Sequence, residues 1–111
     1  MTATFGATDI ATNGTTPVDV VPDPGASNQS ELLLITVWNR DSVDHTYTAQ
    51  KVTGTAVDPM TLGTANIGTL KLGVIPVAGA VVTNGQKIQV KVNAALTTTE
   101  SAVHASYFKI P

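Results

Sequence analysis

The sequence contains no cysteine. Neither a disulfide framework nor a thiolate zinc site can therefore form, and the chain gives no indication of its redox compartment. Stability has to come from side-chain packing or from partner chains. With 111 residues, the chain is in the size range of one domain, which is about 100–150 residues.

Charge is also scarce. Charged residues make up 13% of the chain, against roughly 25% in an average globular protein. The formal net charge is -2, and the few basic residues are scattered along the chain, so they form no basic stripe for a phosphate backbone. We therefore expect no nucleic-acid partner. A surface this poor in charge indicates that part of it does not face water.

Long apolar runs are missing as well. The longest is "LLLITVW" (residues 32–38), which Thr36 interrupts, and it is much shorter than the roughly 20 residues of a spanning helix. The first residues, "MTATFGATDIATNGTT", have neither a positive n-region nor an apolar h-region, so no secretory signal is recognisable. We expect a protein that is made in the cytoplasm and has no membrane partner.

The residues that are present are typical of an all-β protein. Gly, Pro, Asn and Asp recur about every ten residues, between segments rich in Val, Thr, Ile and Tyr. "GQKIQVKVN" and "GTLKLGVI" alternate between apolar and polar residues, as half-buried strands do, and Asn84-Gly85 is a hairpin signal. The predicted core is Leu33, Ile35, Val37, Leu70, Leu72, Ile88, Val90 and Val92.

About seven or eight such strands predict one β-sandwich over residues 17–111, immunoglobulin-like or jelly-roll-like. Residues 1–16 predict an N-terminal arm, whose only large hydrophobic side chains are Phe5 and Ile10. These two residues are the candidate anchors of an assembly interface, because each could bury apolar surface on a neighbouring chain. In the alternative, residues 1–16 add an edge strand to their own sheet.

The segment "ELLLITVWN" (residues 31–39) is apolar on both faces. This pattern is typical of a central strand that is covered from two sides. It is equally typical of a strand whose second face meets another chain. In either case Trp38 is predicted to be a core residue, and Tyr47 and Tyr107 are predicted to bury their rings while their hydroxyl groups find partners.

The densest group of reactive side chains follows this segment, at Asp41, Asp44 and His45. Short polar side chains of this kind stabilise turns between strands. Calcium needs six to eight oxygen ligands, and the chain has neither a GxSxG nucleophile motif nor a cysteine. We expect a surface turn without a metal, and a protein with no catalytic residues and no cofactor.

Two stretches resemble segments of small structural proteins of tailed-bacteriophage virions. In "ITVWNRDSVDHTYTAQKV" (residues 35–52), a strand ends in an "NRD" turn and a second strand with the pattern "HT.T" follows. "NGQKIQVKVNAALTTTESAVHASYFKI" (residues 84–110) is similar to their C-terminal half, where a strand leads through a Thr-rich loop to a last strand that carries a tyrosine.

The resemblance implies a non-enzymatic virion protein that binds itself, with a trimer as one candidate, and other virion proteins such as the major capsid protein. Capsid decoration, as a cement protein, is the leading function, and a tail, baseplate or fibre subunit is the alternative. The implied location is the virion. A carbohydrate-binding module for receptor recognition is a further alternative, although such a module needs exposed aromatic residues and the chain has only five aromatic side chains, Trp38, Phe5, Phe108, Tyr47 and Tyr107.

Overall fold

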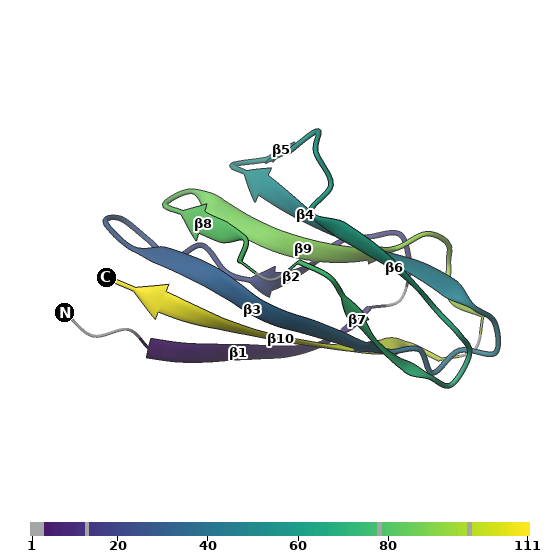
Figure 1. The fold of residues 1–111 in the computed structure, drawn as a ribbon. Coiled ribbons are helices and arrows are strands. Elements are labelled where there is room, and N and C mark those ends of the chain that lie inside the picture. The colour runs from purple at the N-terminus through teal and green to yellow at the C-terminus, as the bar shows by residue number, and fades with distance from the viewer. Residues whose placement is uncertain (1–3, 13, 78, 98) are drawn as a thin grey trace.

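The computed structural model describes residues 4–12, 14–77, 79–97 and 99–111, which form ten β-strands (Figure 1). No helix occurs in these residues, and so none that could cross a membrane. The predicted all-β class is confirmed. The strands are β1 (Thr4–Thr12), β2 (Val18–Val21), β3 (Gln29–Trp38), β4 (His45–Thr53), β5 (Ala56–Val57), β6 (Gly63–Ile67), β7 (Leu72–Ile75), β8 (Val81–Thr83), β9 (Gln86–Val92) and β10 (Ser101–Ile110).

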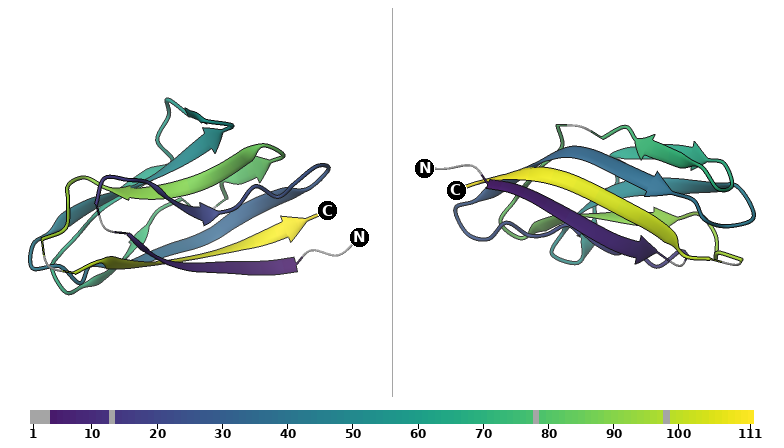
Figure 2. Two further views of the ribbon diagram at one scale, coloured as in Figure 1. Left: turned by 180° about the vertical axis from the view of Figure 1, so that it is seen from behind. Right: turned by 90° about the horizontal axis from the view of Figure 1, so that it is seen from below.

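The strands form two antiparallel sheets of five strands each. Sheet A has the order β1-β10-β3-β7, with β8 also paired to β3, and sheet B has the order β2-β9-β4-β5, with β6 also paired to β4. The sheets lie over one another as the two layers of a sandwich (Figures 1 and 2). The sequence had not suggested β6, since its residues "GTANI" include Gly, Ala and Asn, which are rare in strands.

The core lies between the sheets and confirms five of the eight residues predicted for it. Ile35, Val37, Ile88, Val90 and Val92 are buried there. The cluster also includes residues that alternation did not identify: Val20, Val21, Leu32, Tyr47, Ala49, Ile67, Ile75, Val77, Val82, Val103 and Ala105.

The prediction for Leu33 was wrong because β3 contains a β-bulge. Leu32 pairs with Tyr107 and Leu34 pairs with Ser106, so Leu33 is an extra residue between two regular pairs. A bulge shifts the alternation of side chains by one position. Leu32 and Ile35 therefore both point into the core, while Leu33 is only half-buried.

The predictions for Leu70 and Leu72 were also wrong. Leu70 lies in the turn before β7 and has a φ of 58°, so the regular strand does not include it. In β7 the inward positions belong to Gly73 and Ile75. A Cβ atom on Gly73 would lie 2.8 Å from side-chain atoms of Ile67, so a larger residue there would have to displace the Ile67 side chain. Leu72 on the opposite side is 70% exposed.

Asn84-Gly85 forms a tight turn but not a hairpin. Gly85 has a φ of 85°, as the signal for such a turn requires. The strands on either side belong to different sheets, however, because β8 pairs with β3 and β9 pairs with β2 and β4. The turn carries the chain from sheet A to sheet B.

The described part of the N-terminal segment forms an edge strand of its own sheet. β1 pairs with β10 along its whole length, from Thr4 opposite Lys109 to Thr12 opposite Ser101. Docking of this segment on a neighbouring chain stays a prediction.

We expect Val90→Asp to prevent folding, because Val90 is fully buried in the centre of the core. An unpaired buried carboxylate costs several kcal/mol, and domains are stable by only about 5–15 kcal/mol. Lys91→Asp, one position along on the outer side of β9, is the matched control and should fold. Circular dichroism and thermal melting check both variants, and a cooperative melt of Val90→Asp near that of the wild type would contradict the placement of the core.

Candidate functional site

Two of the three reactive side chains at the turn between β3 and β4 are buried. Asp41 is 0% exposed and His45 is 3% exposed, and His45 Nε2 lies 2.6 Å from Asp41 Oδ2. The expected surface turn is therefore wrong for these two residues. Asp44 is exposed, and its carboxylate accepts a hydrogen bond from the backbone N–H of Thr69 at 2.9 Å.

Asp41 is buried because other loops cover it and supply hydrogen-bond donors. The backbone N–H and the hydroxyl group of Thr97 donate to its carboxylate at 2.9 Å and 2.7 Å. The hydroxyl group of Thr69 donates to its carbonyl oxygen. Asn39 lies beside it and donates from Nδ2 to the carbonyl oxygen of Ile67 at 2.9 Å. The network joins the β3–β4 turn to the β6–β7 turn and the β9–β10 loop.

This geometry suits a structural role better than proton transfer to a substrate. The second ring nitrogen of His45, Nδ1, faces Asn93 Oδ1 at 3.4 Å, so both nitrogens have partners within the protein. A general base has to reach the proton that it abstracts. In the described ranges, no three His, Cys, Asp or Glu side chains gather as metal ligands. The absence of a bound metal stays a prediction.

Tyr47 lies next to this network in the core: its ring is edge-to-face with that of His45, with centroids 6.4 Å apart, and its hydroxyl group lies 2.6 Å from Ser101 Oγ. Burial raises the pKa of Tyr47 above its ordinary value of 10.0, the hydrogen bond to Ser101 lowers it, and the charge of Asp41 raises it. Since folding disfavours the phenolate, the stability that neutral Tyr47 contributes is present below about pH 10 and is lost as the pH rises further.

The outer face of sheet A, formed by the side chains of β1, β10, β3 and β7 that point away from sheet B, is the second candidate site. One row of paired residues across it is Ala11, Ala102, Trp38 and Leu72. The large hydrophobic side chains of this face are Leu72, 70% exposed, Phe5, 64%, Val74, 51%, Trp38, 46%, Leu34, 42%, and Phe108, 39%. No described strand or loop packs over this face as a further layer.

The prediction that Trp38 lies in the core was wrong. Val37 points inward and is fully buried, so the next side chain along β3 points outward. The guanidinium group of Arg40 lies 5.5 Å from the centroid of the Trp38 ring, a cation–π distance, and Arg40 Nε donates to the carbonyl oxygen of Glu100 at 2.8 Å. The apolar second face of β3 is thus open in the single chain.

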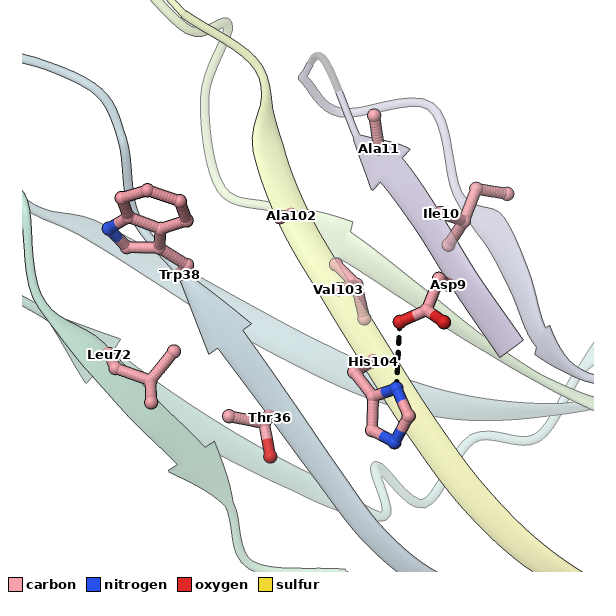
Figure 3. Close-up of a pocket in the computed structure, with 9 residues that line it drawn as sticks. All are labelled: Asp9, Ile10, Ala11, Thr36, Trp38, Leu72, Ala102, Val103 and His104. Atoms are coloured by element: carbon pink, nitrogen blue, oxygen red, sulfur yellow. Dashed lines mark hydrogen bonds and ion pairs between the residues drawn. The ribbon is translucent and has the colours of Figure 1, made fainter. Parts of the chain in front are cut away.

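A groove of about 420 Å³ lies on this face beside Trp38 and Leu72 (Figure 3). It exists because Ala11 and Ala102, which follow Trp38 along the row, have small side chains. Asp9 and His104 border it, and His104 Nδ1 lies 2.7 Å from Asp9 Oδ1.

The two residues proposed as assembly anchors lie on opposite sides of β1. Phe5 points outward and forms an edge-to-face pair with Phe108, with ring centroids 5.6 Å apart. Ile10 is half-buried and packs against the core of its own chain. Neither position tests an interface, but the outward position of Phe5 is the one that another chain could reach.

We expect Asp41→Ala to lower the free energy of unfolding by about 3 kcal/mol or more, because it leaves His45 and Thr97 without their buried acceptor. Asp58→Ala is the control, since the exposed Asp58 carboxylate only accepts a bond from the N–H of Met60 at 3.0 Å. Its effect should stay within about 0.5 kcal/mol. Urea unfolding measures both, and equal effects would argue against the network as a structural lock.

Comparisons with known proteins identify a fold but no family. No protein-family model matches the chain, and no curated protein matches it. Among solved structures, the chain is similar to one of Bacillus endospore appendages, described as disulfide-linked pili, with a TM-score of 0.51 and 11% sequence identity over 97% of this chain and 85% of that one. At this identity the likeness shows the fold alone: this chain shares its β architecture with a pilus protein.

Proposed function

We propose that this protein is a non-enzymatic structural subunit that associates with further copies of itself through sheet A. The observation that carries the proposal is the outer face of sheet A, which leaves six large hydrophobic side chains in water. Exposed apolar patches of this extent mark interaction surfaces in soluble proteins.

The size of the outer face fits a protein interface. A ten-residue strand such as β10 is about 33 Å long at ~3.3 Å per residue, and four strands ~4.8 Å apart extend over about 19 Å. The flat footprint is about 600 Å², close to the ~800 Å² that each partner buries in a stable complex. Aromatic side chains such as Trp38 and Phe5 are the ones that contribute most to such interfaces.

A second copy of the chain is the partner that this surface favours. The face carries few ionisable side chains: Asp9 and His104 are hydrogen-bonded to each other, and Glu31 lies opposite Phe108, so two copies can approach it with little repulsion. The shared fold with a pilus protein also supports self-association. The chain has no cysteine, so its assembly cannot depend on the disulfide links described for those pili.

The particle in which the subunit acts is proposed from the resemblance to virion proteins. We propose the outside of a bacteriophage capsid, where the subunit decorates the major capsid protein, with the tail, baseplate or fibre as the alternative location. Immunogold labelling of purified particles tests this. Label on heads would support decoration, label on tails would support the alternative, and unlabelled particles would contradict a virion location.

Carbohydrate binding is a second candidate, because Trp38 is exposed beside a groove. An aromatic ring can stack on a sugar, but a sugar site also needs convergent polar groups. Most of the groove is lined by apolar residues, and its polar pair, Asp9 and His104, is hydrogen-bonded within the chain. These features favour an apolar protein partner. Glycan-array binding that is lost in Trp38→Ala would support the carbohydrate candidate instead.

We expect Leu72→Lys to weaken self-association strongly, because it places a charge at the β7 end of the apolar row, next to Trp38. Leu72 is 70% exposed, so the folded chain should tolerate the change. Val57→Lys is the matched control, since Val57 is 52% exposed on β5 of sheet B. Light scattering over a concentration series measures both. A wild-type chain that stays monomeric at its highest soluble concentration would refute the proposed function.

A further inference from the structure

β1 is an edge strand without the features that normally protect an edge. It is nine residues long, and in the described residues it pairs with β10 on one side only; in the ribbon its other side is open (Figure 2, right). Its sequence, "TFGATDIAT", contains no proline, no lysine and a single charge, Asp9. Long edges of this kind are templates for pairing with another chain.

The other edges of the sandwich are protected. β2 has four residues and a β-bulge, and lies between Pro17 and Pro22. β7 has four residues and ends before Pro76, while β5 and β8 have two and three residues. β6 has five. Short strands, bulges and prolines all prevent pairing between edges. The contrast singles out β1 as the edge that is open to a second chain.

We propose that β1 pairs antiparallel with β1 of a second copy, with Thr8 on the two-fold axis, and that Phe5 of each copy covers the groove of the other. The proposal rests on the proposed self-association and names the segment that carries it. A two-fold axis requires the two strands to run antiparallel. The pairing joins the two A sheets into one continuous sheet.

The register follows from the residues of β1. With Thr8 opposite Thr8, the two copies pair over the whole strand, and Thr4 faces Thr12 of the second copy. If Asp9 instead of Thr8 lay on the two-fold axis, the Asp9 carboxylates of the two copies would be opposite one another, which destabilises a sheet. Within the described strand, an axis at Ala7 would pair residues 4–10, two fewer than an axis at Thr8. A shift that pairs odd with even positions would bring outward side chains onto the inner face.

The groove is then filled from the second copy. In this register Phe5 faces Ala11 of the second copy, so the row Leu72, Trp38, Ala102, Ala11 continues into Phe5 and Phe108 of the neighbouring chain. Directly opposite residues have Cβ atoms about 4.5–5.5 Å apart. Because Ala11 and Ala102 are small, the ring of Phe5 has room to lie over them towards Trp38. The open edge, the groove and the exposed Phe5 thus have one explanation.

Single cysteines test the register cleanly, because the chain contains no other. The proposed pairing places Ala7 opposite Asp9 of the second copy, and both side chains are exposed. An equimolar mixture of Ala7→Cys and Asp9→Cys chains, oxidised with copper phenanthroline, should give mainly the mixed disulfide dimer, which mass spectrometry distinguishes from the two homodimers. Val57→Cys, exposed on sheet B, is the control and should form little disulfide.

Each other outcome overturns the proposal. Dominant Ala7→Cys homodimers would indicate a centre at Ala7, and dominant Asp9→Cys homodimers would indicate a centre at Asp9. Crosslinking no faster than that of Val57→Cys would show that the β1 edges do not meet. If the wild-type chain still self-associates by light scattering in that case, the proposed function stands and only the edge pairing fails. A monomeric wild-type chain would refute both.

The role of Phe5 has its own readout. Phe5→Ala should raise the dissociation constant of the dimer about tenfold or more, as truncation of a buried aromatic anchor does. It should also reduce the change in Trp38 fluorescence that accompanies dimerisation. Met60→Ala, which removes a side chain that is 77% exposed outside sheet A, is the control. An unchanged dissociation constant for Phe5→Ala would refute the anchor.

Discussion

The pairing of β3 with β10 is the interaction on which the rest of the structure depends. These two ten-residue strands form the centre of sheet A, and their register decides which side chains point towards sheet B and which point to solvent. Val37 and Val103 pair on the inner face, while Trp38 and Ala102 pair on the outer face. The same backbone pairing therefore determines both the core on the inner face of sheet A and the proposed assembly surface on its outer face.

Sequence patterns were sufficient where a strand has one polar face. β9 alternates strictly between apolar and polar residues, so Ile88, Val90 and Val92 were placed correctly. They were insufficient where both faces are apolar or where alternation is interrupted. A bulge leaves no mark in three consecutive leucines, and Gly73 occupies an inward position that hydrophobicity assigns to Leu72. Trp38 was misplaced for the same reason, since size and hydrophobicity do not say which face of a two-sided strand is covered.

The candidate sites could be predicted from the sequence only in part. Asp41 was identified as reactive, but its burial depends on Thr97, which is 56 positions further along the chain. A local sequence window contains no such donor. The groove depends on Ala11, Ala102 and Trp38, which become neighbours only through the pairing of β1, β10 and β3. Phe5 was proposed as an anchor from sequence because it is one of only two large hydrophobic residues in its segment. The structure places its side chain outward, and the anchor role stays a prediction.

An uncovered apolar face and an open edge are hazards for a free chain, because both promote unlimited association. Two-fold pairing of β1 would remove this hazard at the edge, since it uses the long edge of both copies and leaves only short or protected strands outside. The outer face would behave differently. Joining two A sheets doubles it, to about 1,200 Å² by the same strand spacings, and the enlarged face is still open to a partner stacked on it. Pairing of the β1 edges thus ends at a dimer, because the two-fold axis uses both edges, while packing of the outer faces has no such limit. A subunit with these two surfaces can first form the β1-paired dimer and then build a larger assembly from such dimers.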